Sequence, residues 1–309
     1  MERLKKSNMQ TERRSEAIAC YLMILTEIVG FLVLTCYPII WTFRWSWFSY
    51  NGIPSQTRFI GWDNFKTIFT TDFTYWKTWL NTLKFTALKI PGEFVLSMGT
   101  ALILKREIKG GNFFRTVFYL PSIISVVVIG LVFSNLFGYR GFVNGVLVKT
   151  GILKTAIDWF STGPKAMFVL VTGSIWNTFG VNVMYYLAAF CNVPQEMYES
   201  AKLDGASPWT TFIRITMPMI APVFKIVLML SIIGTIGINE YIIVLTNGGP
   251  SGQTATVMSY LTKQFVPGFA EETAPALGYG CAMSLVTTII FALIAWLYNV
   301  FSKKVSSIS

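Results

Sequence analysis

The sequence contains no histidine, and only 13% of its 309 residues are charged. Without histidine it lacks the commonest metal ligand and the commonest general base near neutral pH, which argues against hydrolytic or metal-dependent chemistry. The cysteines are also few: Cys20, Cys36, Cys191 and Cys281 lie in or beside apolar stretches, without the paired spacing of a zinc site or a redox motif. We therefore expect no metal site and no disulfide framework.

The chain also lacks the phosphate-binding pattern Gly-x-x-x-x-Gly-Lys-Ser/Thr, so it is not expected to bind ATP in the usual way. If ATP is involved, another chain must bind it. The net charge of +10 does not indicate nucleic-acid binding, because the basic residues fall between apolar stretches and form no clustered face on a soluble domain.

Apolar residues dominate what is present, at 53% of the chain. A membrane core of about 30 Å needs about 20 apolar residues per helix. Six spans are predicted, at 18–43, 79–104, 115–137, 166–192, 222–246 and 275–301. The predicted fold is an all-α integral membrane protein with one domain, 18–301, between tails 1–17 and 302–309. The first apolar run is too long for a cleavable signal and is expected to remain as a span.

The connections between these spans alternate in charge. Connections on one side carry fourteen basic residues in short segments: Arg3, Lys5, Lys6, Arg13, Arg14, Lys105, Arg106, Lys109, Arg115, Lys202, Arg214, Lys225, Lys303 and Lys304. The other side, although longer in total, carries nine. The positive-inside rule then places both termini in the cytoplasm and loops 44–78, 138–165 and 247–274 outside. The loop at 247–274, including Tyr260 and Phe265, is a candidate surface for a receptor.

The inner connection at 194–218 has the pattern of a helix, a turn and a second helix. Gly205 suits a left-handed helix C-terminus, and Ser207 followed by Pro208 suits the start of a new helix that Pro218 would end. The second helix carries an apolar stripe expected to pack on the spans: Trp209, Phe212, Ile213 and Thr216. The first helix then presents Glu196, Glu199, Lys202 and Asp204 to solvent. An ordinary amphipathic surface helix is the alternative interpretation.

A family resemblance appears at these residues. The order Glu199-Ser200-Ala201, three residues, Gly205, nine residues, then Ile215-Thr216-Met217-Pro218 resembles the EAA loop of bacterial ABC importer permeases. It departs from the family consensus in Ser200, where the family has Ala, and in Met217, where it has Leu. The string 198–206 is similar to the carbohydrate-importer branch, as is the segment 245–250, and the resemblance covers roughly 18–301.

The resemblance implies a type I ABC importer permease that works by alternating access. In that family the short helix around Glu199 enters a cleft of a cytoplasmic ATPase, so the implied coupling residues are Glu199, Ser200, Ala201, Asp204, Gly205, Ala206 and Pro218. The implied partners are a second homologous permease, an ATPase dimer that carries ATP and Mg, an extracytoplasmic solute-binding protein, a sugar and membrane lipid. No cofactor is expected on this chain, and the expected location is the bacterial cytoplasmic membrane.

A sugar that crosses the bilayer needs hydrogen-bonding groups inside the bundle. Similarity to the larger permease of the maltose importer implies a path that includes Asn177, Thr178, Val181, Ser231, Gly234, Thr235 and Ile238. Polar and aromatic residues in the fourth and fifth predicted spans are further candidates: Trp176, Asn182, Tyr185, Tyr186, Asn239, Glu240 and Tyr241. Hydrogen bonding between helices is the competing role for such residues. Because most of these side chains differ from those of the maltose permease, the resemblance predicts the position of the cavity better than it predicts the substrate.

The second predicted span contains unusual charges, Lys84, Lys89 and Glu93. Lys89 and Glu93 are four residues apart and can pair on one helix face. The alternative is that Glu93 faces the transport path.

Three other functions stay open. EAA loops are shared across substrates, so a permease for amino acids, peptides or phosphate is the nearest alternative. A secondary transporter would have no use for such a loop. A membrane-embedded enzyme is disfavoured by the absence of histidine and of paired acidic motifs at a membrane face.

Overall fold

The computed structural model describes residues 2–106, 108–266 and 276–306, with the side chains of 2–15, 17 and 303–306 left aside. In this described part the chain is helical apart from one antiparallel pair of two-residue strands, β1 (Phe48–Ser49) and β2 (Arg58–Phe59). The helices are α1 (Glu2–Phe31), η1 (Leu32–Cys36), α2 (Tyr37–Trp45), η2 (Pro54–Gln56), α3 (Asp63–Thr70), α4 (Phe73–Leu104), α5 (Gly111–Tyr119), η3 (Leu120–Ile123), α6 (Val126–Leu136), α7 (Phe142–Lys149), α8 (Gly163–Cys191), α9 (Gln195–Leu203), α10 (Pro208–Thr211), η4 (Phe212–Thr216), α11 (Met217–Ile236), α12 (Glu240–Thr246), α13 (Val257–Phe265) and α14 (Leu277–Ser306).

Five helical segments of the described chain are long and apolar enough to cross a membrane: Ile18–Trp45, Phe73–Leu104, Gly163–Cys191, Pro208–Ile236 and Leu277–Ser302. A sixth span is possible if Gly111–Ile123 and Val126–Leu136 are counted together. The all-α membrane fold predicted from hydropathy is therefore confirmed, with span ends that shift by several residues. The start of the last predicted span, residue 275, lies outside the described residues.

The predicted third span, 115–137, is not a straight helix. The two helical pieces meet at an angle of 98°. Pro121 lies at the start of η3, and Ile124 and Ser125 are extended, with ψ of 137° and 134°. Proline has no N–H to donate to the preceding turn, so the helix breaks where hydropathy alone predicts continuity.

The predicted fifth span, 222–246, is wrong at both ends. Helix runs without interruption from Pro208 to Ile236, and α12 is separated from it at 237–239. Pro218 does not end the preceding helix as expected. The π-helical turn η4 widens the backbone just before it, and the Met217 N–H reaches back five residues to Phe212 O. The widened turn accommodates a proline that cannot donate a backbone hydrogen bond, so the chain continues as helix.

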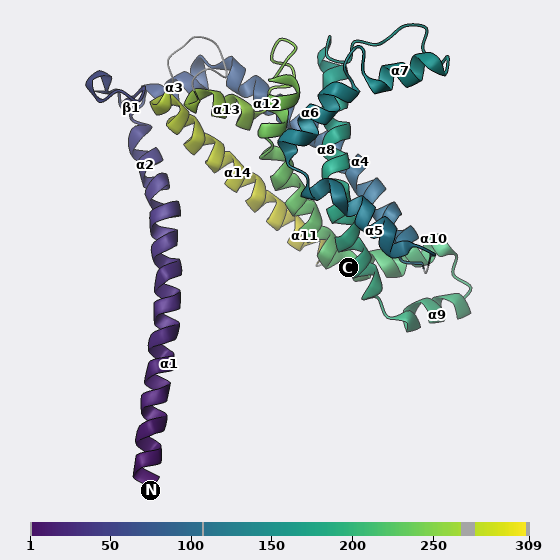
Figure 1. The fold of residues 1–309 in the computed structure, drawn as a ribbon, viewed down its shortest axis with the longest axis horizontal. Helices are drawn as coiled ribbons and strands as arrows, with labels where there is room; N and C mark the ends of the chain where they lie inside the picture. Colours follow the sequence, from purple (N-terminus) through teal and green to yellow (C-terminus); the bar gives the residue numbers. More distant parts are fainter. Residues whose placement is uncertain (1, 107, 267–275, 307–309) are drawn as a thin grey trace.

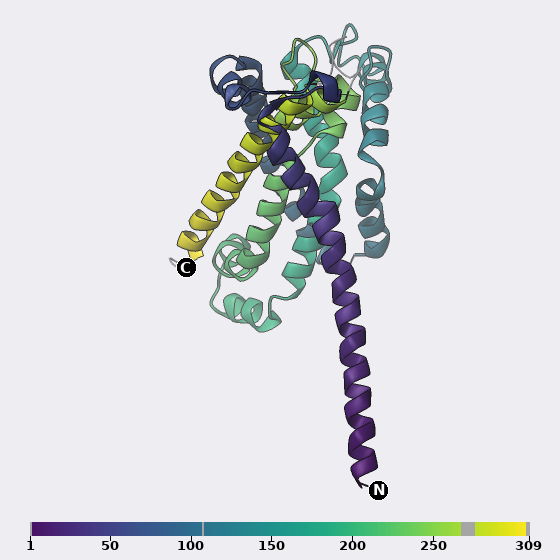
Figure 2. The ribbon, with the colours of Figure 1, turned by 90° about the vertical axis from the view of Figure 1, so that its left-hand side faces the viewer.

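The packed body of the molecule forms around α4 and α8, which lie along each other, with α11 against both (Figure 1). By contrast, α1 stands away from this body in Figure 1, and its N-terminal part projects beyond the body in Figure 2. The loop with α9 and the end of α14 lie toward one end of the bundle, and α3, α7, α12 and α13 lie at the other (Figure 1). The bundle therefore has two structurally different ends.

Candidate coupling loop and transport cavity

The loop between α8 and α11 has the helix, turn and helix order expected from its sequence. Gly205 ends α9 in the left-handed region with φ of +72°, and the Ala206 N–H donates to Ala201 O at 2.9 Å. Ser207 caps the next helix by accepting a hydrogen bond from the Thr210 N–H at 3.2 Å. Both predicted turn features are confirmed, and they fix the angle between α9 and α10.

Most of the implied coupling residues are exposed. Glu199, Ser200 and Asp204 on α9 lie in solvent, whereas Ala201 is buried against the body. The apolar Leu203 at the end of α9 is 89% exposed. A fully exposed leucine beside charged residues is typical of a surface that a partner covers. Gly205 and Pro218 are also exposed, and Ala206 is half-buried.

The apolar stripe predicted for the second helix is only half correct. Phe212 packs on the core and Thr216 is buried, but Trp209 is 70% exposed and Ile213 is 47% exposed. The expected stripe assumed a regular α-helix, whereas Phe212–Thr216 is a π turn that holds more residues than an α turn, so the four positions do not share one face.

Tyr198 connects α9 to the membrane helices. Its ring lies under the Lys105 ammonium, 4.1 Å from Nζ, just after the end of α4. Its hydroxyl is within 3.2 Å of Thr216 Oγ1 at the base of α11. A displacement of α9 would therefore act on α4, which carries the buried charges described below, and on α11, which contacts them.

A cavity of about 660 Å³ lies among α8, α11 and the 237–241 segment. Its polar lining includes Lys89, Ser122, Ser174, Asn177, Thr178, Asn182, Tyr185, Ser231, Asn239, Glu240 and Tyr241. Of the predicted path residues, Asn177, Thr178, Val181, Ser231, Gly234, Ile238 and Asn239 line this cavity. The structure thus brings seven of the eight together.

Thr235 is the exception. It is 1% exposed, lies behind the cavity wall and accepts a hydrogen bond from Lys89 Nζ at 3.0 Å. Asn177 lines the cavity, but its amide also donates to Pro121 O at 2.9 Å and so holds the bend between η3 and α6. Helix-to-helix bonding, the competing role considered above, therefore applies to both residues.

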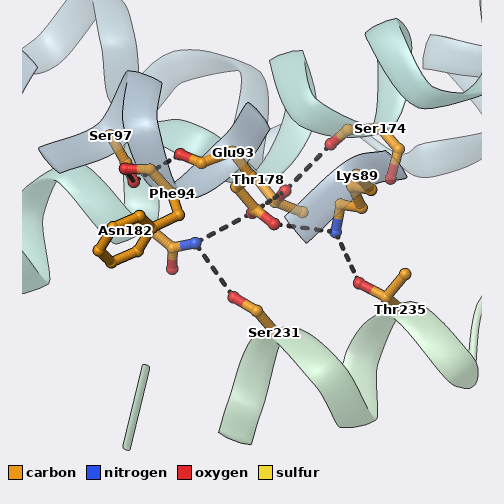
Figure 3. A network of polar contacts seen from close by, with 9 residues as sticks. All are labelled: Lys89, Glu93, Phe94, Ser97, Ser174, Thr178, Asn182, Ser231 and Thr235. Atoms are coloured by element: carbon orange, nitrogen blue, oxygen red, sulfur yellow. Dashed lines mark hydrogen bonds and ion pairs between the residues drawn. The ribbon is translucent and has the colours of Figure 1, made fainter. Parts of the chain in front are cut away.

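The charges of α4 form a buried network with α8 and α11 (Figure 3). Lys89 and Glu93 are 4% and 2% exposed, and Lys89 Nζ lies 3.4 Å from Glu93 Oε2. Glu93 Oε1 accepts hydrogen bonds from the Thr178 hydroxyl and, at 2.9 Å, from Asn182 Nδ2. Asn182 also donates to Ser231 Oγ at 3.2 Å. A buried charge is tolerated only with such partners, so the network ties three helices together.

This geometry confirms the pairing expected for Lys89 and Glu93. It does not place Glu93 on the cavity wall, because Lys89 lines the cavity and Glu93 lies behind it among α8 side chains. Lys84 is exposed on the outer surface of α4 and joins none of these contacts.

The lining also includes residues outside the predicted path. Ser122 and Ser174 were not singled out from the sequence, Lys89 was noted only as an unusual charge, and Asn182, Glu240 and Tyr241 were candidates by polarity alone. The charges in an apolar stretch were the available signal for Lys89. Glu240 and Tyr241 lie beyond the break after Ile236, and their position could not be read from a pattern that predicted an unbroken span.

The predicted receptor-facing loop is only partly described, since 267–275 lie outside the described residues. Tyr260 turns inward and donates to Asp72 Oδ2 at 3.1 Å, and Tyr279 donates to the same oxygen at 2.6 Å. Burial and the Asp72 carboxylate raise the pKa of Tyr260 well above its usual range. Phe265 is half-buried on α13. Tyr260 therefore holds α13 against α4 by its hydroxyl.

Residues 94–307 match the family described as binding-protein-dependent transport system inner membrane component. The match covers more than half of the chain. The chain belongs to this family. It is a multi-pass inner-membrane permease of an ABC transporter, a component without catalytic activity of its own, and the resemblance drawn from the EAA loop is confirmed at this level.

The permease is similar to known proteins over almost its whole length. It is 32% identical to the probable ABC transporter permease protein YesP of Bacillus subtilis, covering 91% of this chain and 89% of the relative. It is 31% identical to the arabinooligosaccharides transport system permease protein AraP of the same organism, covering 91% and 87%. The crystal structure of a bacterial ABC transporter involved in the import of the acidic polysaccharide alginate has a chain of the same fold, with a TM-score of 0.79, 24% identity and coverage of 95% and 98%.

Proposed function

We propose that this permease is one of two permease subunits of an ATP-driven importer for a sugar or oligosaccharide. The observation that carries the proposal is the cavity of about 660 Å³, whose lining combines small hydroxyl and amide side chains with a neutralised lysine. Such groups exchange hydrogen bonds with sugar hydroxyls without holding them tightly, and weak binding permits release. The relatives that carry a sugar in their names support the same substrate class.

The proposed energy source is a separate ATPase dimer that binds ATP and Mg. The exposed helix α9, with Glu199 and Asp204 beside the uncovered Leu203, is the proposed contact with that ATPase. Through Tyr198 its movement would reach α4 and α11 and turn the cavity from the outside to the inside. An extracytoplasmic solute-binding protein would deliver the sugar to the opposite end.

The test is reconstitution of the permease with its ATPase, second permease and receptor in vesicles. We expect ATP hydrolysis that rises with the loaded receptor, together with uptake of a labelled neutral sugar such as arabinotriose or lactose. Uptake of an amino acid, a peptide or phosphate in place of any sugar would assign the permease to the nearest alternative. Uptake that continues without ATPase and depends on an ion gradient would contradict the whole proposal.

The proposed orientation has both termini in the cytoplasm. In a background without native cysteines, Gln253→Cys is expected to react with an impermeant maleimide in intact cells, because residue 253 is exposed on the outer connection before α13. Lys202→Cys on α9 should react only after the membrane is opened. The reverse pattern would overturn the orientation and the receptor position together.

A further inference from the structure

The segment between α11 and α12 presents polar atoms to the cavity that have no partner in the described protein. Asn239 Oδ1 and Tyr241 Oη are buried without a hydrogen-bond partner among the described residues. Glu240, between them, also lines the cavity and forms neither of the ion pairs found in the described part of the chain. Buried polar groups are nearly always satisfied in folded proteins, so the unpaired oxygens of Asn239 and Tyr241 require an explanation, whereas the exposed Glu240 carboxylate is open to solvent.

The neighbours of Asn239 fix the orientation of its side-chain amide. Its Nδ2 donates to Thr262 Oγ1 at 2.8 Å. The Thr262 hydroxyl donates its only proton to Met258 O at 3.0 Å, so it can only accept a hydrogen bond from Asn239. This arrangement requires the amide to present nitrogen to Thr262 and leaves Oδ1 as a free acceptor.

The hydroxyl of Tyr241 lies against Gly173 of α8, which also lines the cavity. Its ring is 1% exposed within the core, and a Cβ added at Gly173 on α8 would come within 2.1 Å of the phenol oxygen. Only glycine at 173 leaves room for the hydroxyl at the cavity surface. Thr256, next to α13, fixes the same segment by donating to Ile238 O at 3.1 Å. Asn239 and Tyr241 are therefore positioned by their neighbours before any ligand arrives, and Glu240 lies between them in the chain.

The charge of the lining restricts what can bind there. Lys89 and Glu240 are the two charged residues among the described residues that line the cavity. Lys89 is neutralised by Glu93 at 3.4 Å, so the unpaired charge is the Glu240 carboxylate. A carboxylate and an amide oxygen only accept hydrogen bonds. Sugar hydroxyls can donate to them, whereas an ionised uronate offers a like charge and is repelled.

We propose that Asn239, Glu240 and Tyr241 form a subsite for the hydroxyl groups of an uncharged sugar, and that Glu240 excludes sugars that carry carboxylates. This inference rests on the proposed sugar-import function and names its substrate class. It differs from the path residues implied by the family resemblance, which end at Ile238 and include neither Glu240 nor Tyr241.

The first experiment measures which probes the complete wild-type complex takes up: arabinotriose, lactose and digalacturonate. We expect the complex to take up a neutral probe and not to take up digalacturonate. Uptake of digalacturonate alone would overturn the subsite and leave the importer function intact. If none of the three sugars is taken up while a non-sugar solute is, the proposed function fails and the subsite falls with it.

The second experiment uses the transported neutral probe with Tyr241→Phe and Glu240→Gln, and with Tyr139→Phe and Asp63→Asn as controls at exposed outer positions. Each subsite change should lower initial uptake roughly tenfold, which is about 1.4 kcal/mol. Receptor-stimulated ATP hydrolysis and the melting temperature should be unchanged. A hydroxyl that bonds nothing in the protein can be removed without loss of stability, so Tyr241→Phe separates binding from folding.

Two results would overturn the proposal. Uptake equal to wild type in both subsite variants would show that the groups do not meet the sugar. Uptake and melting temperature that fall in parallel in both variants would show that the residues act only in folding.

Discussion

The charged side chains of α9 lie in solvent, whereas two charged side chains of α4 lie in the interior. Glu199 and Asp204 are exposed and form no ion pair in the described structure, whereas Lys89 and Glu93 are almost fully buried and are bound to each other and to α8 and α11. Both regions belong to one permease and both are candidates for function. They differ in what holds their charges: solvent on α9, and the protein itself on α4.

Because of this difference, we expect α9 to contribute to coupling and the buried network of α4 to contribute to stability. A change on the exposed face of α9 would affect the proposed contact with the ATPase and leave the packed body untouched. A change in the Lys89 and Glu93 network leaves a charge or a polar group without its partner inside the bundle, which costs far more than the loss of an exposed ion pair. Variants in the two regions should therefore fail in different assays.

The largest effect is expected on α9. Glu199→Lys reverses the charge at the proposed ATPase contact, and Gly205→Pro cannot adopt φ of +72° because proline is fixed near −65°. In both variants uptake should fall to background and receptor-stimulated ATP hydrolysis should be lost. The melting temperature of Glu199→Lys should equal that of the wild type. Asp63→Lys on the outer helix α3 is the control. Wild-type uptake in either variant would remove α9 from the coupling mechanism.

A blocked cavity should stop uptake without breaking coupling. Thr178→Trp places a large ring on the lining of α8, so uptake should fall to a small fraction of wild type. The receptor should still stimulate ATP hydrolysis, because α9 is intact. Thr172→Trp is the matched control, since Thr172 is on the same helix but does not line the cavity. Normal uptake with Thr178→Trp would mean that the path runs elsewhere.

The buried network should show its effect in stability. Glu93→Gln leaves the Lys89 ammonium without its anion, and breaking a buried pair costs about 3 to 5 kcal/mol. Thermal unfolding of the purified complex in detergent should show a clear drop in melting temperature. The double variant Lys89→Met with Glu93→Gln should recover most of it, because no charge is then buried. Equal losses in single and double variants would argue against an ion pair.

The smallest effect is expected for one hydrogen bond at the edge of the network. Ser231→Ala removes the acceptor of the 3.2 Å bond from Asn182 and one hydroxyl from the cavity lining. A single bond is worth about 1 kcal/mol, so uptake should change by roughly a factor of five. Ser284→Ala in α14, whose hydroxyl donates to Gly280 O, is the control and should match wild type.

Much of the loop could be predicted because its signals are local. The left-handed turn at Gly205 and the cap at Ser207 depend on residues within one or two turns, and both are present in the structure. The stop at Pro218 failed because the outcome depends on the neighbouring π turn, which no local residue type announces. The straight third span failed for a similar reason, since hydropathy averages over Pro121 and does not register a bend.

The sequence by itself determined the membrane class, the apolar segments, the coupling-loop pattern and seven of the residues around the cavity, because apolar length, charge between spans and short-range spacing act along the chain. Only the tertiary structure decided that Thr235 lies behind the wall, that Lys89 and not Glu93 lines the cavity, and that Asn239 and Tyr241 beside it each carry an unpaired oxygen. The physical reason is that these placements depend on α4, α8, α11 and α13 meeting in space, and the direction of a side chain between packed helices is set by its neighbours and not by its own residue type.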